Sequence, residues 1–291
     1  MKIAVSADFH LRRDRPRVRT DEDWILSQKN NVVELFRKCR DLNVDKLLLV
    51  GDILDSSNQP PWVVNIIPEA MDTVKAEGPW SVEVHIIPGN HDLQHHQYAN
   101  LHNSSIGNLM RMKGVVPHGV NKKFENTDFL EEFGIVIIHR LIMPDANESL
   151  ARLANAEIAA DIMESFPTAE FILTGDYHKH YVEIYEDTIL FNPGCLNRQS
   201  ADEKNYEVGF YAFDTEDSSY GFFPLESDDV TLIDDSYLVE QHAREDSLTA
   251  YAEQLASSKG LSFDLWEVVK KLSVNSSKLV KNILEEIRTN V

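Results

Sequence analysis

The chain has few cysteines and no long apolar segment. Only Cys39 and Cys195 occur among its 291 residues, too few for a disulfide framework and in keeping with a reducing compartment. No apolar run approaches the length of a membrane span, and Asp8 and His10 interrupt the stretch where a signal peptide needs unbroken apolar residues. We therefore expect a cytoplasmic protein without a membrane segment.

Basic residues are also scarce. The chain carries 28 lysines and arginines against 48 aspartates and glutamates, a net charge of -20, which ordinarily argues against a nucleic-acid partner. The bases are unevenly distributed, because residues 1–19 hold six basic and two acidic residues whereas residues 200–291 hold 8 basic and 19 acidic ones. The arginines at 12, 13, 15, 17 and 19 directly follow Asp8-Phe9-His10, so local positive charge could hold a DNA backbone there. A solvated surface loop is the simpler alternative for the same cluster.

The apolar pattern predicts an α/β layered fold. Short apolar strands alternate with helical stretches over the first 175 residues. Apolar spacing predicts helices from Asp23 to Arg40 and from Glu148 to Ser165. Between residues 181 and 233 consecutive short strands predict an antiparallel sheet added to the mixed one. The predicted strands of the first part are residues 3–7, 46–50, 82–87, 135–138 and 171–174.

The last part of the chain has a different pattern. After about residue 240 the apolar residues recur at helical spacing, on either side of Gly260. We therefore expect two regions, residues 1–233 with the layered fold and residues 234–291 as a helical tail or a reduced cap. The apolar stripes of the tail predict packing on the protein's own core or docking of a partner.

Polar clusters follow each of the five predicted strands. In open α/β sheets, functional groups collect at the carboxyl ends of the strands, so these clusters should converge on one site. Taken alone, each cluster is ordinary, since Gly-Asp and Gly-Asn are common turns and a single histidine is more often a core residue than a ligand. In chain order they are Asp8-Phe9-His10, Gly51-Asp52-Ile53-Leu54-Asp55, Pro88-Gly89-Asn90-His91-Asp92, His139 and Gly175-Asp176-Tyr177-His178.

The residue types predict a two-metal centre. Carboxylates, imidazoles and an amide oxygen, without a thiolate, suit divalent ions such as Mn²⁺, Fe²⁺ or Zn²⁺. Two ions about 3.5–4 Å apart can hold a phosphate and supply a nucleophile at neutral pH. The natural reaction for such a centre is phosphoester hydrolysis.

The ordered clusters resemble those of the calcineurin-like metallophosphoesterase superfamily over about residues 1–225. Within that superfamily the chain is most similar to SbcD-type DNA exonuclease subunits of bacteria and phages. The stretches that carry this likeness are KIAVSADFHL, YHKHY and NPGCLNRQSADEKNYEVGFYAFD. The resemblance implies a four-layer αββα sandwich of two mixed β-sheets flanked by helices, here with a short helical C-terminal appendage.

The resemblance also implies roles for individual residues. His91 would stabilise the transition state or protonate the leaving oxygen, and Asp92 would orient the His91 ring. The nucleophile would be a hydroxide activated by two ions, most simply Mn²⁺, with Mg²⁺, Fe²⁺ or Zn²⁺ as other choices. The implied ligands are Asp8, His10 and His178 for the first ion, Asn90, His139 and Asp176 for the second, and Asp52 between the two. Apart from the resemblance, we expect basic side chains near the centre to bind substrate, namely Arg12, Arg13, Arg15, Arg17 and Arg198.

Two positions depart from the family pattern. The last motif of the family is Gly-His-x-His, and Asp176 stands here for its first histidine. Alternation along an extended chain would equally allow His178 and His180 to be the ligands of this segment, so His180 remains a candidate. Asp55 stands where SbcD-type nucleases usually have a histidine, and it could lie in or beside the centre.

Three functions remain open. The first is a DNA exonuclease or endonuclease, the catalytic subunit of an SbcCD-like repair or recombination complex. The resemblance then implies DNA and an SbcC-type ABC ATPase as partners and is compatible with a homodimer. The setting would be a bacterial cell, or the host cytoplasm if a phage encodes the protein. The second is a phosphatase or a nucleotide or cyclic-nucleotide phosphodiesterase, which Asp55 and the acidic surface favour. The third is a non-catalytic scaffold, against which the intact ligand set argues.

Overall fold

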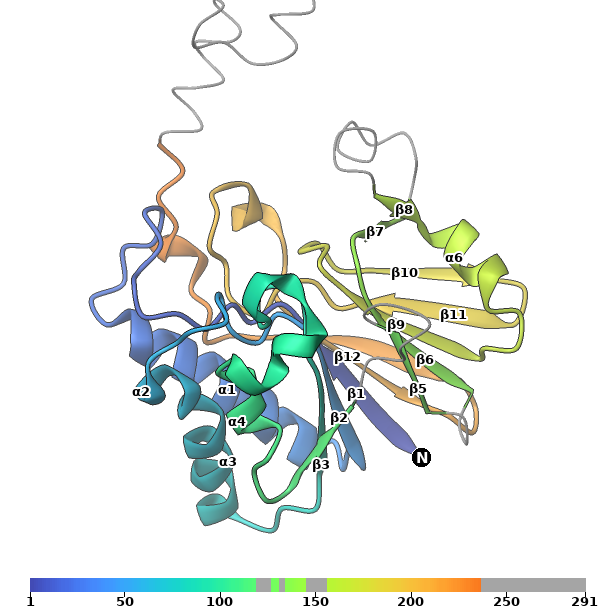
Figure 1. Ribbon diagram of the computed structural model, residues 1–291, viewed down its shortest axis with the longest axis horizontal. Coiled ribbons are helices and arrows are strands. Elements are labelled where there is room, and N and C mark those ends of the chain that lie inside the picture. The colour runs from blue at the N-terminus through green and yellow to red at the C-terminus, as the bar shows by residue number, and fades with distance from the viewer. Residues whose placement is uncertain (119–126, 131–133, 145–155, 237–291) are drawn as a thin grey trace, which may run out of the picture. The chain divides into compact units, whose positions relative to one another are not determined.

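The computed structural model describes residues 1–118, 127–130, 134–144 and 156–236 (Figure 1). The chain divides into two compact units, Met1–Ile233 and Asp234–Val291. The helical tail expected after residue 240 lies outside the described residues, and so do residues 148–155 of the second predicted helix. The description below concerns the first unit.

The first sheet has six strands in the order β13-β12-β1-β2-β3-β4. Strands β1 to β4 are parallel, β12 pairs antiparallel with β1, and β13 pairs antiparallel with β12. The side chains of β1 alternate between two cores, since Ala4 faces one core while Ile3 and Val5 face the other. The strand bounds are Lys2–Ser6 (β1), Lys46–Val50 (β2), Glu83–Ile87 (β3), Val115–Pro117 (β4), Gly209–Asp214 (β12) and Tyr220–Pro224 (β13).

The second sheet has five strands in the order β10-β11-β9-β6-β5. Strands β11, β9 and β6 are parallel, and the edge strands β10 and β5 pair antiparallel with their neighbours. A separate two-stranded ladder joins β7 (Ile142–Met143) to β8 (Glu157–Ile158). The bounds of the main strands are Thr127–Leu130 (β5), Ile135–His139 (β6), Phe171–Gly175 (β9), Tyr181–Tyr185 (β10) and Thr188–Asn192 (β11).

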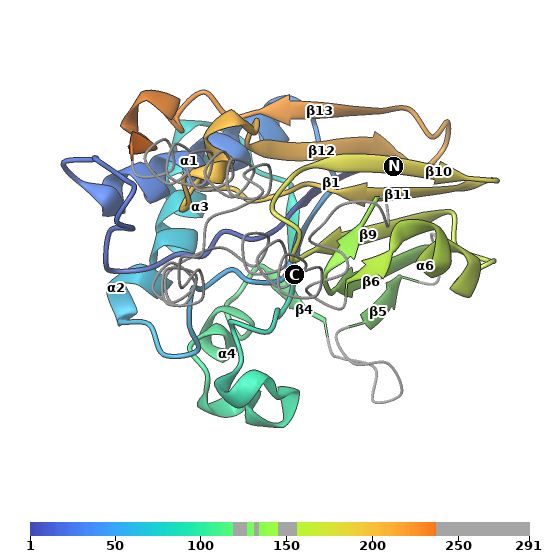
Figure 2. The same ribbon diagram turned by 90° about the horizontal axis from the view of Figure 1, so that it is seen from above.

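The helices lie on the outer faces of the two sheets. Helix α1 begins after Asp23, whose side chain accepts a hydrogen bond from the Leu26 amide, and it buries an apolar face that includes Leu35 and Phe36. Figures 1 and 2 show α1 and α3 beside the first sheet and α6 beside the second. None of the described helices is long and apolar enough to cross a membrane. The α-helices are α1 (Trp24–Asp41), α2 (Pro61–Val64), α3 (Ile66–Glu77), α4 (Ile106–Leu109) and α6 (Ala159–Ser165), and the 3₁₀ turns are η1 (Gln94–His96), η2 (Tyr98–Asn103), η4 (Asp202–Asn205) and η5 (Val230–Leu232).

Three apolar cores separate four layers. One core lies between the first sheet and α1, α3 and α4, and it contains Leu47, Leu49 and Phe36. A second joins the two sheets through residues such as Val5 and Phe171, and a third packs α6 on the second sheet. The fold is therefore the predicted α/β sandwich of two mixed β-sheets flanked by helices, and all five predicted strands are present with ends that differ by at most one residue.

Two details of the predicted elements are wrong. Residues 157 and 158, expected in a helix, form β8 because their backbone pairs with Ile142 and Met143. The strands after residue 181 do not make one added sheet, since the hairpin β10–β11 joins the second sheet and the hairpin β12–β13 joins the first. In both cases pairing with a strand distant in sequence decides the outcome.

Candidate metal centre

The polar clusters that follow the parallel strands come together in the structure. The Nε2 atoms of His10 and His178 are 3.2 Å apart. His139 Nε2 lies 3.1 Å from Asn90 Oδ1 and 3.3 Å from Asp52 Oδ2. These side chains come from the ends of β1, β2, β3, β6 and β9, so the strand ends converge as the sequence predicts.

The backbone at this end of the sheets has an uncommon conformation. Asp8, His10, Asp52 and Asp176 all have positive φ, between 44° and 82°. Such strained residues cluster at functional sites, where the surrounding structure holds them. Here the loops hold one another, because the Asp8 amide donates to the Gly51 carbonyl (3.1 Å) and the His10 amide donates to the Asp52 carbonyl (2.9 Å).

Gly89 is required by close approach to the centre. A Cβ atom at this position would lie 2.2 Å from Asp52 Oδ1 and 2.6 Å from His139 Nε2. No side chain can occupy that space, so the backbone of the loop after β3 can lie directly against two predicted ligands.

Asp52 is the central carboxylate. Its Oδ1 accepts a hydrogen bond from the His91 amide at 2.8 Å. Its Oδ2 is buried without a hydrogen-bond partner among the described residues, and it lies 3.3 Å from His139 Nε2 and 3.9 Å from His10 Nε2. An unsatisfied buried carboxylate oxygen is costly unless a cation completes it. This oxygen thus lies between imidazole nitrogens of two predicted metal ligands, His10 and His139.

Two overlapping groups of ligand atoms surround Asp52. In one, atoms of Asp8, His10 and His178 all lie within 4.8 Å of one another, and in the other the same holds for Asp8, Asp52 and His139. The first group has the composition that the sequence predicts for the first ion. The donor set, carboxylates and imidazoles in a buried site, fits divalent metal ions.

The ring of His139 has its orientation fixed. Its Nδ1 contacts the Val50 carbonyl at 2.8 Å, where Nδ1 must donate, so Nε2 presents its lone pair toward Asn90 and Asp52 when the ring is neutral. A hydrogen bond of this kind from the distant ring nitrogen is typical of a metal-bound histidine.

The charges of the protein alone perturb these groups strongly. Burial raises the pKa of Asp8 to about 7, although His139 opposes the change. Burial lowers the pKa of His10 to about 3. Burial also acts to lower the pKa of His139, but the negative charge of Asp52 outweighs it and raises that pKa to about 10. Concentrated, partly buried charge of this kind is typical of functional sites.

The two residues of the predicted catalytic pair lie in different environments. His91 is exposed, its ring stands edge-on to His10 at 5.0 Å, and its Nδ1 contacts the Asp55 carbonyl at 3.1 Å. Asp92 does not orient that ring as predicted. It is fully buried and accepts hydrogen bonds from the amides of Ile53, Leu54 and Gly89 at 3.2, 2.7 and 2.9 Å. Asp92 therefore joins the loops after β2 and β3.

The structure distinguishes between the two candidate registers of residues 176–180. His180 Nδ1 contacts the Tyr211 hydroxyl at 3.0 Å, and its ring stacks on Phe222 at 4.0 Å. The Asp176 amide donates to both Asp8 oxygens, and the Asp176 carboxylate raises the pKa of His139. The side chain of His180 is therefore engaged elsewhere, and the backbone of Asp176 is joined to Asp8, while the role of the Asp176 carboxylate as a ligand stays a prediction.

The predicted substrate-binding arginines differ in exposure. Arg12 Nη1 donates to Asp55 Oδ1 at 3.0 Å and to Gln199 Oε1 at 3.3 Å, and Asp55 Oδ1 lies 3.9 Å from His10 Nδ1. Arg13, Arg15 and Arg17 are exposed on the segment that follows. The prediction for Arg198 is wrong, because its buried guanidinium donates to Asp228 and to the carbonyl oxygens of Glu203 and Tyr206.

Two residues of the centre were not predicted. Glu203 Oε1 lies 2.5 Å from His178 Nδ1. The Gln199 side chain accepts from Arg12 and donates to the His10 carbonyl at 2.8 Å. Both lie in the segment NRQSADE, which has no periodic pattern, so only its likeness to a family segment could have indicated a role.

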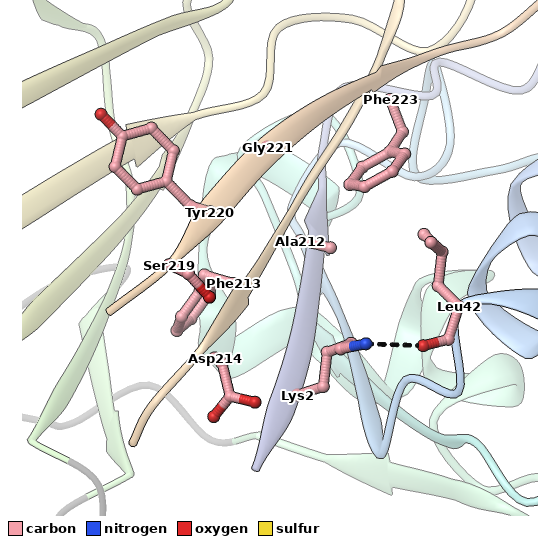
Figure 3. Close-up of a pocket in the computed structure, with 9 residues that line it drawn as sticks. All are labelled: Lys2, Leu42, Ala212, Phe213, Asp214, Ser219, Tyr220, Gly221 and Phe223. Atoms are coloured by element: carbon pink, nitrogen blue, oxygen red, sulfur yellow. Dashed lines mark hydrogen bonds between the residues drawn. The ribbon is translucent and has the colours of Figure 1, made fainter. Parts of the chain in front are cut away.

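The structure has a cavity at the other end of the first sheet (Figure 3). Its volume is about 340 Å³, and its lining includes Lys2, Asp214 and Phe223. Lys2 begins β1, whereas the metal-ligand candidates follow the end of that strand, and the Lys2 ammonium is held by the Leu42 carbonyl at 2.9 Å. None of the lining residues is a candidate ligand, so we assign no substrate to this cavity.

Fold and centre together define a hydrolase of the metallophosphoesterase type, with a carboxylate and imidazole centre at the ends of parallel strands. The chain belongs to the calcineurin-like phosphoesterase superfamily, because the model of that superfamily's domain matches residues 1–218. Members of this superfamily use divalent metal ions, and the ligand groups described above fit that chemistry.

Comparison with individual proteins adds more distant likenesses. Among solved structures, an archaeal phosphodiesterase is 15% identical, with a TM-score of 0.42, and the match covers 77% of this chain and 100% of the other. A single mutant of Vps29 from Entamoeba histolytica is also 15% identical, with a TM-score of 0.35, and the match covers 77% of this chain and 98% of the other. A search of curated protein sequences finds no significant match.

Proposed function

We propose that the chain is a metal-dependent DNA nuclease that hydrolyses phosphodiester bonds. The observation that carries this proposal is the arginine segment beside the centre. The Arg12 guanidinium lies on Asp55, next to His10, and three exposed arginines continue from it along the chain. Several guanidinium groups on a segment that leaves a hydrolytic centre suit a substrate with many phosphates in a row.

The residues of the centre have separable tasks in this proposal. Two bound ions, Mn²⁺ in the simplest case, would polarise the phosphate and lower the pKa of a coordinated water. Asp52 would be shared by the ions, with Asp8, His10 and His178 on one side and Asn90, His139 and Asp176 on the other. Because Nδ1 of His91 is engaged by the Asp55 carbonyl, Nε2 is the nitrogen that can exchange a proton with the leaving oxygen.

A second candidate is hydrolysis of a small phosphoester, as by a phosphatase or a nucleotide or cyclic-nucleotide phosphodiesterase. The pairing of Arg12 with Asp55 favours it, because the carboxylate neutralises the arginine nearest the centre. The net charge of -20 also opposes the approach of a long polyanion.

One set of assays separates these functions. The protein with Mn²⁺ is offered linear double-stranded DNA, a chromogenic phosphodiester and a chromogenic phosphomonoester. Degradation of DNA that decreases steeply with salt supports the nuclease. Turnover of small esters alone supports the second candidate, and bound metal without any turnover would indicate a scaffold.

Two variants serve in these assays. Asp52→Ala should abolish all hydrolysis, and full activity in this variant would overturn the two-metal account. Arg12→Ala is expected to weaken DNA cleavage more than cleavage of the chromogenic diester, since only DNA carries further phosphates along the arginine segment.

We also propose that an SbcC-type ABC ATPase is the partner and that Asp234–Val291 docks on it. The resemblance to SbcD-type subunits and the apolar stripes in the sequence after residue 240 support this assignment. Co-purification of the ATPase with the full chain, and its loss when residues 234–291 are deleted, would be the expected result. Equal co-purification with both forms would contradict it.

A further inference from the structure

His178 presents one ring nitrogen to the centre and the other to a buried carboxylate. Its Nε2 lies 3.2 Å from His10 Nε2, among the ligand atoms of the first group. Its Nδ1 lies 2.5 Å from Glu203 Oε1. A carboxylate oxygen can only accept, so Nδ1 must carry the proton of this hydrogen bond.

Glu203 is held in place from the other side. Its side chain is only 4% exposed. Its Oε2 accepts hydrogen bonds from the amides of Gln199 at 2.6 Å and Ser200 at 3.0 Å, which leaves Oε1 directed at His178. Both oxygens of the carboxylate are thus engaged, one by the backbone and one by the imidazole.

The loop that carries Glu203 is anchored independently. Arg198 Nε donates to the Glu203 carbonyl at 3.2 Å, and Arg198 Nη1 donates to Asp228 Oδ2 at 2.6 Å. The other oxygen of Asp228 accepts from Arg19 Nη1 at 2.8 Å. The position of the carboxylate is therefore fixed by contacts that do not involve the centre.

Cys195 also lies close to this pair, with its sulfur within 4.8 Å of the His178 and Glu203 ligand atoms. Glu203 already uses both oxygens, one toward the Gln199 and Ser200 amides and the other toward His178 Nδ1. The three residues are thus better explained as a support of His178 than as another metal site.

We propose that Glu203 is a positioning residue of the metal centre, which accepts the Nδ1 proton of His178 and thereby keeps the Nε2 lone pair directed at the first ion. The inference rests on the proposed function only in requiring that the centre binds divalent ions. A carboxylate behind a metal-bound imidazole fixes its tautomer and ring orientation and increases its basicity.

Glu203→Gln tests the tautomer directly. The glutamine oxygen can still accept from the Gln199 and Ser200 amides, which places its NH₂ group against His178 Nδ1. That nitrogen must then accept, which disfavours the Nδ1-protonated tautomer whose Nε2 lone pair an ion requires. Mn²⁺ binding at one of the two sites is expected to weaken about 10- to 100-fold, as measured by the electron paramagnetic resonance signal of free Mn²⁺.

Glu34→Gln is the matched control. Glu34 likewise accepts from two successive backbone amides, those of Glu226 at 2.9 Å and Ser227 at 2.7 Å, but it has no contact with a candidate ligand. It should bind Mn²⁺ as the unchanged protein does. If Glu203→Gln binds Mn²⁺ as tightly as Glu34→Gln, Glu203 has no positioning role.

Glu203→Asp serves if the glutamine variant does not fold. The aspartate keeps a carboxylate acceptor but places it one methylene further from His178 Nδ1. The Mn²⁺ affinity of one site should therefore decrease by several-fold, which is less than the decrease expected for Glu203→Gln. Unchanged affinity in this variant would overturn the proposal. Mn²⁺ binding is measured without substrate, so these outcomes do not depend on hydrolysis. The proposed function fails separately, if the unchanged protein binds no metal or hydrolyses no ester.

Discussion

Asp176 and His180 show at the scale of single residues how contact decides between equivalent patterns. We expect His180→Ala to leave metal content unchanged but to reduce the free energy of unfolding by about 1–2 kcal/mol, since it loses a ring stack and a hydrogen bond. Asp176→His should shift the preference from Mn²⁺ toward Zn²⁺, because it removes a carboxylate from the second site. Metal analysis and urea denaturation measure these effects. If only His180→Ala disturbs metal binding, the ligands of this segment are His178 and His180 rather than Asp176 and His178.

The imidazoles of His139 and His178 couple metal binding to pH. Burial lowers the pKa of each, but Asp52 raises that of His139 to about 10, and the Glu203 hydrogen bond raises that of His178 to about 9. Both rings are therefore protonated at neutral pH, and an ion must displace a proton from each. Affinity for Mn²⁺ should increase from about pH 6 to about pH 9, with protons released on binding.

Titration calorimetry in buffers of different ionisation enthalpy counts the protons released. An affinity that does not change with pH over this range, without proton release, would contradict the arrangement of charges described above.

The sequence predicted the centre at these positions because the information is local. A polar residue at the carboxyl end of a buried parallel strand, such as Asp8 or His139, lies where the neighbouring parallel strands also end. This placement does not depend on contacts elsewhere in the chain. The roles of Asp92, Arg198 and Glu203 depend on partners 38, 30 and 25 residues away. No local pattern specifies such partners, so the sequence predicts a substrate ligand at the buried Arg198 and no role for Glu203.

The loops after β2 and β3 are the elements on which the geometry of the centre depends. Asp92 accepts hydrogen bonds from three backbone amides of these loops. Asp92→Ala should leave those buried donors unsatisfied and reduce the free energy of unfolding by at least about 3 kcal/mol. His91→Ala is the matched comparison, since its exposed ring should be needed for hydrolysis but contribute little to stability. Urea denaturation that finds the two variants equally stable would show that Asp92 does not hold the loops.

The elements that are predicted wrongly from the sequence pair with strands elsewhere in the chain. Glu157 and Ile158 follow a helical apolar pattern, yet their backbone pairs with β7. The hairpins β10–β11 and β12–β13 have similar strand patterns, and their assignment to different sheets follows from which parallel strand each one borders. Periodicity reports which face of an element is buried, but not which neighbour buries it.

For the molecule as a whole, the residues predicted an α/β fold and the family resemblance supplied the two-sheet sandwich. The two sheets are held together by a core in which residues of β1, such as Ile3 and Val5, meet Phe171 and Phe213. Both faces of β1 are buried, which explains its unbroken apolar run. A single sheet with helices on both faces would also bury both faces of such a strand. The apolar run therefore does not predict the number of sheets.

The contacts of the first unit, Met1–Ile233, continue to its last residues. Asp228 pairs with two buried arginines, Arg19 at 2.8 Å and Arg198 at 2.6 Å, and thereby joins the arginine segment to the loop of Glu203. The Thr20 amide donates to the Leu232 carbonyl at 2.9 Å, so contacts of this unit continue almost to Ile233. All contacts described for the centre lie within Met1–Ile233.

We therefore predict that a chain ending at Ile233 folds, binds two Mn²⁺ ions and hydrolyses the same chromogenic ester as the full chain. A chain ending at Leu225 is the matched control. It lacks Asp228, so the buried Arg198 guanidinium loses its carboxylate and Arg19 keeps only Asp21, at a cost of about 3–5 kcal/mol. Thermal unfolding and Mn²⁺ binding of both chains measure the difference. If the chain ending at Leu225 is as stable as the longer one, the buried pairs do not close the unit, and if both fail to fold, residues 234–291 are part of it.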